Sequence, residues 1–182
     1  MKKITISFLL LIVANVATFA QDYKKVRTPL NTFLLLGTDA KLEEAKNELD
    51  KLSLDPKAQA KAETFLLATE IYGSVSMSNS LKDKYPQAAL KGLESLKKYL
   101  SMEPTAEKFK EDNYVGVNAI YNSFFDKGYN FFKAKSWDSA YTLLKPMVSK
   151  GEVVHLFFTI MSPISTIGFN RVYAESQLFT LK

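Results

Sequence analysis

The sequence has no cysteine and only one histidine among its 182 residues. Without cysteine, the chain can form no disulfide, zinc finger, iron–sulfur cluster or thiol nucleophile. His155 has no cluster of further metal ligands at a fixed spacing around it, so we interpret it as a structural residue. These absences exclude a disulfide framework and give no reason to expect a metal site.

Glycine is also scarce, with seven residues scattered along the chain. They form no GxGxxG pattern and no phosphate-binding loop. No nucleophile, base and orienting group can be assembled from the pattern, and acidic pairs such as Glu43-Glu44 belong to polar helix faces. We therefore expect a protein that is not an enzyme and that binds no cofactor.

The excess of positive charge is small, with 24 Lys and Arg against 19 Asp and Glu. Removing Lys2 and Lys3, which belong to the leader described next, leaves 22 − 19 = +3. A charge this small, with no basic stripe, argues against a nucleic-acid partner. The 47% of hydrophobic and 24% of charged residues are typical of a globular chain, and the length favours one domain.

Residues 1–20 have the pattern of a secretory signal peptide. They begin with MKK, continue through a mostly apolar run at Ile4–Val16, and end with the small residues Ala17 and Ala20. A transmembrane anchor is the alternative, but the run is shorter than the roughly 20 residues of a span. We expect cleavage near Ala20, a periplasmic or extracellular protein that begins at Gln21, and no stable membrane span in it.

From about Thr28 to Val148 the apolar pattern is helical and does not alternate with period two. Spacings of three and four predict a helix face formed by Leu42, Ala45, Leu49 and Leu52, with Thr38 or Asp39 as its cap. Asp55-Pro56 predicts the start of a second helix reaching Tyr72, followed by a Ser-rich loop that begins at Gly73. Pro86 predicts the start of a third helix, which ends near Met102.

The remaining helical stretches follow with short connections. Thr105 is expected to cap a stretch through Tyr114, with a break or kink at Gly116, and the last pair covers residues 121–134 and 137–145. Pro146 is expected to end or kink the last helix. The fold class predicted for residues 21–150 is all-α: an array of about three antiparallel helical hairpins.

The segment FFDKGYNFFKAKSWDSAYTLLKPM, residues 124–147, resembles a tetratricopeptide repeat (TPR). The family pattern of bulky, small and aromatic residues matches Phe124, Gly128 and Phe131, and its later alanine and bulky residue match Ala140 and Leu144. The resemblance implies that Gly128 and Ala140 face each other between two helices. Weaker copies surround Ala45 and Ala89 and depart from the usual repeat length.

A second aromatic stripe on residues 121–134 is formed by Phe125, Tyr129 and Phe132. The resemblance implies a groove that binds a partner peptide along this stripe, with Asn122 and Lys133 at its edge. The alternative is that these rings pack against a neighbouring hairpin. Phe125 and Tyr129 argue against the Lys- and Asn-based grip on a terminal carboxylate that some TPR grooves use.

Residues 151–182 form an apolar tail that does not continue the helical pattern. The segment VVHLFFTIMSPISTIGF, residues 153–169, has no acidic residue, lysine or arginine and includes Pro163 and Gly168. Three hypotheses stay open: a foreign reading frame or truncation junction, a cap on the last hairpin, or a docking segment for a membrane or partner.

The sequence thus predicts an exported bacterial helical-repeat scaffold that binds another envelope protein or peptide, with its oligomeric state unassigned. Outer-membrane assembly, secretion and nutrient uptake are the settings considered. One alternative is a carrier of a small hydrophobic ligand held between aromatic stripes. Another is an accessory subunit of a cell-wall or uptake complex whose catalytic residues lie on a different chain.

Overall fold

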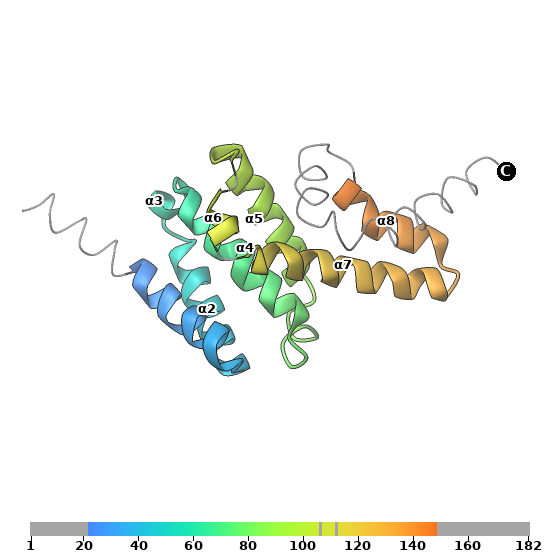
Figure 1. The fold of residues 1–182 in the computed structure, drawn as a ribbon, viewed down its shortest axis with the longest axis horizontal. Coiled ribbons are helices and arrows are strands. Elements are labelled where there is room, and N and C mark those ends of the chain that lie inside the picture. The colour runs from blue at the N-terminus through green and yellow to red at the C-terminus, as the bar shows by residue number, and fades with distance from the viewer. Residues whose placement is uncertain (1–21, 106, 112, 149–182) are drawn as a thin grey trace, which may run out of the picture. The chain divides into compact units, whose positions relative to one another are not determined.

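The computed structural model describes residues 22–148, except 106 and 112, and describes side chains as far as residue 144. This part of the chain consists of helices and connecting turns and contains no strand, which confirms the all-α prediction (Figure 1). The signal peptide predicted at 1–20 and the tail at 151–182 lie outside the described residues.

The first two helices form a pair joined by a tight turn. The first covers residues 22–36, so it starts well before Thr28, and the second is α2, Asp39–Leu52. Gly37 ends the first helix with a φ of 68°, a left-handed conformation that favours glycine. Thr38 takes the N-cap position of α2, although its side chain makes no capping hydrogen bond there.

The second helical region is split in two. Asp55 caps α3, Pro56–Gln59, by accepting a hydrogen bond from the backbone nitrogen of Lys57, with Pro56 at the first position. The chain then breaks before α4, Ala62–Met77, so the expectation of one helix to Tyr72 is wrong. The hydroxyl of Thr64 donates to the carbonyl of Ala58 at 2.7 Å, which satisfies a backbone group at the break.

The expected loop beginning at Gly73 is also wrong, because α4 continues to Met77. A Cβ on Gly73 would lie 2.4 Å from the carbonyl oxygen of Gly116, and one on Gly116 would lie 2.4 Å from Cα of Glu70. Two helix backbones therefore touch here, which only residues without a side chain allow. The glycines mark a packing contact rather than the end of a helix.

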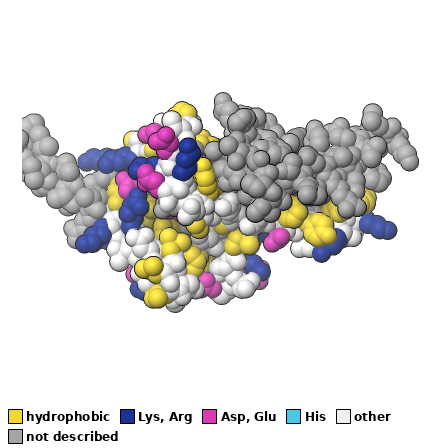
Figure 2. Space-filling model, viewed as in Figure 1, with side chains coloured by type: hydrophobic (Ala, Val, Ile, Leu, Met, Phe, Trp, Pro, Cys, Tyr) yellow, Lys and Arg dark blue, Asp and Glu magenta, His cyan; other side chains and the backbone are white. Residues whose placement is uncertain are grey.

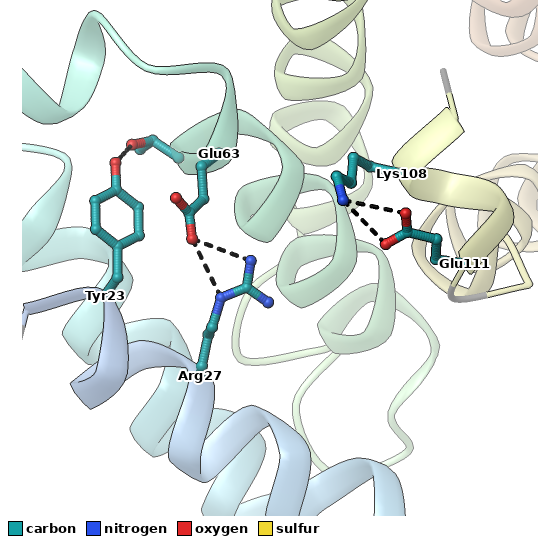
Figure 3. A network of polar contacts seen from close by, with 6 residues as sticks. Tyr23, Arg27, Glu63, Lys108 and Glu111 are labelled. Atoms are coloured by element: carbon teal, nitrogen blue, oxygen red, sulfur yellow. Dashed lines mark hydrogen bonds and ion pairs between the residues drawn. The ribbon is translucent and has the colours of Figure 1, made fainter. Parts of the chain in front are cut away.

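The core around α2 and α4 contains the apolar face predicted for α2. Buried residues of the first helix, α2 and α4 pack together with α3 and the loop after α4; they include Val26, Leu30, Leu42, Ala45, Leu49, Leu52, Leu67 and Ile71. Polar contacts attach the first helix to α4, as Figure 3 shows: Arg27 bonds Glu63, and Tyr23 bonds Thr64 at 2.6 Å. These contacts fix the first helix in place beside the apolar core.

Helix α5, Ala88–Met102, packs along α4 and ends where predicted, but it begins two positions after Pro86. The short α6, Glu107–Glu111, places Phe109 edge-on against Tyr99, with ring centroids 4.8 Å apart. Its Lys108 pairs with Glu111 within the same helix (Figure 3). A second buried cluster is thus formed between α5 and α6.

Helix α7, Val115–Lys133, starts after a turn in which Asn113 and Tyr114 have φ values of 49° and 57°. The predicted break at Gly116 therefore lies at these two residues instead, because Gly116 belongs to the first turn of α7. The chain divides into two compact units between Phe124 and Phe125, within α7. The second unit contains the rest of α7 and α8, Trp137–Val148, which runs two residues past Pro146.

Candidate functional site

The C-terminal part of α7 carries the aromatic residues that the sequence predicted to line a groove. Phe125, Tyr129 and Phe132 are four and three residues apart, so a helix places them on one side, one above another. A turn at residues 134–136 then brings in α8 with Trp137 as its first residue. The helix spacing and the turn together bring four aromatic side chains close to one another. We call them the aromatic row: Phe125, Tyr129, Phe132 and Trp137.

The rings of the aromatic row are in contact. Phe125 and Tyr129 are stacked with centroids 6.0 Å apart and planes 4° from parallel. Tyr129 and Phe132 are stacked at 6.5 Å and 11°. Phe132 meets Trp137 edge-on at 4.9 Å and 78°, a geometry that aromatic quadrupoles favour. The contacts restrict the rings, so less side-chain freedom remains to be lost when something binds them.

Part of the aromatic row faces solvent. Tyr129 and Trp137 are 44% and 42% exposed, while Phe125 and Phe132 are half-buried. In Figure 2, hydrophobic side chains and a Lys or Arg lie together over the C-terminal half of α7. Burying exposed rings of this size is a large driving force for association. Within the second unit, the rings therefore do not pack fully into a core.

The two polar residues predicted at the edge of the groove have different positions. Lys133 places its ammonium 4.7 Å from the centroid of the Tyr129 ring, a cation–π contact at the end of the stacked rings. Asn122 is exposed on α7, and its place at the edge of the groove stays a prediction. The structure therefore brings Lys133 to the aromatic row.

The hairpin beneath the aromatic row is closed by small and apolar residues. Phe124 and Ala140 are buried, and a Cβ on Gly128 would lie 2.7 Å from the side chain of Leu144. Phe131, which matches the aromatic position of the repeat pattern, is 42% exposed and is therefore only partly packed. The Leu144 side chain fills the space that Gly128 leaves free, and the predicted approach of Gly128 to Ala140 stays a prediction.

Trp137 is the residue of this surface that the sequence reasoning did not include. The helical spacing within α7 gives the first three rings, but Trp137 belongs to the next helix. The feature that could have indicated Trp137 is the short turn between the two helices. In this turn Lys135 has a φ of 59°, and the carbonyl of Ser136 accepts a hydrogen bond from the Ala140 nitrogen at 3.0 Å. A turn this tight places the first residue of α8 beside the last turn of α7.

The first unit contains a polar cluster of ionisable side chains that contact one another. Lys46, although buried, pairs with Asp50 at 2.8 Å and lies 4.3 Å from the centroid of the Tyr85 ring. Tyr72 donates a hydrogen bond to Asp50, and its pKa is raised well above the usual value by burial and by that carboxylate. Charged and phenolic groups that satisfy one another in this way hold helices together.

Glu43 extends this cluster to the loop that connects α4 and α5. Its carboxylate accepts hydrogen bonds from the ammonium of Lys84 and the hydroxyl of Tyr85. These two donors hold the pKa of Glu43 below its usual value. The interactions tie the loop to α2, so we assign this cluster a structural role.

Among the described residues, no three or more His, Cys, Asp or Glu side chains lie where they could hold a metal ion. None of the described helices is long and apolar enough to cross a membrane. The predicted structural role of His155 falls outside the described residues. No family model, curated protein or solved structure matches this chain.

Proposed function

We propose that this chain is an exported scaffold of TPR-like helical hairpins that binds another protein or peptide of the bacterial envelope through the aromatic row. The proposal rests on the exposure of Tyr129, whose ring is stacked with those of Phe125 and Phe132. Aromatic residues of this kind dominate the binding energy of protein interfaces. The row offers a preformed apolar surface.

The repeat part of the proposal is supported by pairs of helices joined by tight turns and by glycines at their closest approaches. Gly73 and Gly116 lie at a contact of α4 with α7, and Gly92 lies beside Ile120. Gly128 receives Leu144 in the last pair. Small residues at such points let helix backbones approach, which an array of hairpins requires.

The chemistry of the row indicates what kind of segment it accepts. Its exposed rings suit apolar or aromatic side chains, whereas the ammonium of Lys133 adds one positive group at the end of the stack. A partner segment with an apolar residue next to a carboxylate would contact both. Lys133 is thus expected to orient the segment rather than to supply most of the affinity.

The experiment is photo-crosslinking in cells that produce the protein naturally. A photoreactive phenylalanine analogue in place of Tyr129 should give a discrete adduct with one envelope protein, since the ring then lies in the interface. The same analogue in place of Lys98, which is exposed on α5, is the control and should not give that adduct. The absence of a specific adduct at Tyr129 would contradict the proposal.

Substitutions then measure the contribution of the ring to binding of the crosslinked partner. Tyr129→Ser should weaken binding about tenfold or more, the effect of losing a central aromatic contact, whereas Tyr129→Phe should nearly preserve it. Leu54→Ser is the matched surface control, because Leu54 is an exposed apolar residue of a loop in the first unit. Equal losses for Tyr129→Ser and Leu54→Ser would show that the row is not the binding surface.

A further inference from the structure

The first helix, residues 22–36, ends in a compact group of apolar side chains that face solvent. Leu34, Leu35 and Leu36 are 48%, 83% and 72% exposed, and Gly37 ends the helix directly after them. We call these three leucines the leucine tip. Contiguous large apolar side chains left in water mark a surface that binds something.

The leucine tip lies in a stretch of the sequence without charge. Residues 28–38 contain no Asp, Glu, Lys, Arg or His. The charged residues that follow have partners of their own. Asp39 accepts a hydrogen bond from the hydroxyl of Ser80, and Lys41 pairs with Glu44 at 2.6 Å. The tip can therefore leave water without stripping a charged side chain of its hydration, which would be costly.

The geometry of the leucine tip favours a fluid apolar phase over a protein surface. Consecutive residues of an α-helix are rotated by roughly 100° about its axis, so the three leucines point to different sides. The exposed side of the preceding turns is polar, with Lys24, Thr28 and Asn31 in solvent. A second copy of the chain lying along this helix would bury those polar groups. Three residues are also far fewer than the roughly 20–30 that each partner contributes to a stable protein interface.

The end of the helix limits how deep the tip can go. The Gly37 nitrogen donates a hydrogen bond to the carbonyl of Phe33 at 2.7 Å, but the last carbonyl groups of a helix need water or another donor. Such groups cannot be taken into hydrocarbon without a partner. The leucine side chains can therefore enter an apolar phase only while the backbone that carries them stays at its wet boundary.

We propose that the leucine tip inserts shallowly into a phospholipid bilayer and holds the chain reversibly on a membrane surface. A bilayer surrounds all three side chains, and its head-group region hydrates the carbonyls at the helix end. The apolar surface of three leucines is comparable with that of one acyl chain, which gives reversible binding rather than permanent anchoring. This inference does not rest on binding of a partner by Tyr129, since it concerns the first unit alone.

A fluorescent label at the leucine tip tests the inference. The sequence contains no cysteine, so a single one can be introduced and labelled without removing another. Leu35→Cys in the full chain, labelled with a fluorophore sensitive to polarity, should emit at shorter wavelength when vesicles of pure phosphatidylcholine are added. A quencher attached to the upper part of the acyl chains should then reduce the emission. Because the label reports position 35 alone, vesicle binding through another part of the chain does not give this result.

Two further variants serve as the control and as the test of the neighbouring leucines. Leu54→Cys with the same label is the control, because Leu54 is 80% exposed in the turn after α2, and it should respond neither to vesicles nor to the quencher. Leu34→Asn and Leu36→Asn, added to the Leu35→Cys protein, remove most of the tip without adding charge. They should weaken the apparent affinity for vesicles about tenfold. Far-UV circular dichroism should show equal helix content, since the replaced side chains are exposed.

Three results would overturn the inference. A label at position 35 that does not respond to pure lipid would leave a protein surface as the occupant of the tip. Equal responses at positions 35 and 54 would indicate adsorption without a preferred site. A shift that grows with protein concentration in the absence of vesicles would identify a second copy of the chain as the occupant. A response that is confined to position 35 and unchanged by added salt, which screens charges, is the result we expect of an uncharged tip.

Discussion

At the scale of single residues, glycine has a different role from the one its position in the sequence indicates. Gly73 precedes a run rich in serine, and Gly116 follows a stretch predicted to be helical through Tyr114, so both look like helix ends. Both instead lie where helix backbones touch. Sequence alone cannot separate these roles, because a glycine that allows a close contact and a glycine that ends a helix are the same residue.

This difference predicts the effect of adding one methyl group. Gly116→Ala would place a Cβ 2.4 Å from Cα of Glu70 and 2.8 Å from the carbonyl oxygen of Thr69. Backbone atoms of a packed helix cannot move aside cheaply, so the free energy of unfolding should fall by about 2–3 kcal/mol. Urea denaturation followed by circular dichroism measures this loss.

Gly92→Ala is the matched comparison within the same group of helices. Its nearest neighbours at 2.9 and 3.0 Å are the end of the Ile120 side chain, which can rotate away, although the Gly73 nitrogen lies 3.3 Å away. Alanine also favours a helix by about 1 kcal/mol over glycine, which offsets part of the crowding. Gly92→Ala should therefore be clearly milder, and equal losses for the two variants would refute this account of the glycines.

At the scale of helices and loops, local sequence patterns correctly predicted a buried helix face and several helix ends. The face of α2 is buried as expected, Asp55 and Pro56 open α3, and α5 ends at Met102. The break before α4 was not predictable, because Ala60-Lys61 contains neither glycine nor proline. Helix ends of this kind are decided by tertiary packing, which a local pattern does not contain.

The candidate site shows the same contrast between features that local spacing predicts and features that tertiary packing decides. Spacing along one helix was enough to place Phe125, Tyr129 and Phe132 on one side of α7. Trp137 was not found, since its contact with Phe132 depends on the geometry of a turn between two helices.

The loop between α4 and α5 predicts how acid affects stability. Lys84 and Tyr85 hold the pKa of Glu43 below its usual value, and Ser80 and Ser78 do the same for Asp39. A carboxylate whose folded-state pKa is lowered stabilises the fold above its unfolded-state pKa, about 4. That stability is lost as the pH falls further, through the lowered folded-state value.

The prediction for this loop concerns Glu43→Gln. The variant should be less stable than the parent at pH 7, by a fraction of the loss for Gly116→Ala. The difference should narrow as the pH is lowered from 7 to 3, because the stability contributed by the ionised carboxylate is lost progressively below the unfolded-state pKa of about 4. Urea midpoints at the two pH values measure it. Glu44→Gln is the control, because Glu44 pairs with Lys41 of its own helix and does not attach the loop. A difference that stays constant with pH would contradict the assigned role of Glu43.

At the scale of the whole molecule, the proposal of an exported scaffold makes a prediction about where the mature chain starts. The small residues at Thr18 and Ala20 suit the pocket of a signal peptidase, which cannot accept a large side chain immediately before the cut. Mass spectrometry of the protein from a cell-envelope fraction should therefore find Gln21 as the first residue.

Ala20→Leu tests whether that start is made by cleavage. It should leave the precursor uncut and attached to the membrane through its apolar run, whereas Ala14→Leu, within that run, should be processed normally. The described helices begin at residue 22 and should fold in both proteins, so circular dichroism of the soluble product verifies the control. If the chain keeps Met1 and stays in the cytoplasm, the envelope location in the proposed function is wrong. Binding through Tyr129 could still be tested on its own.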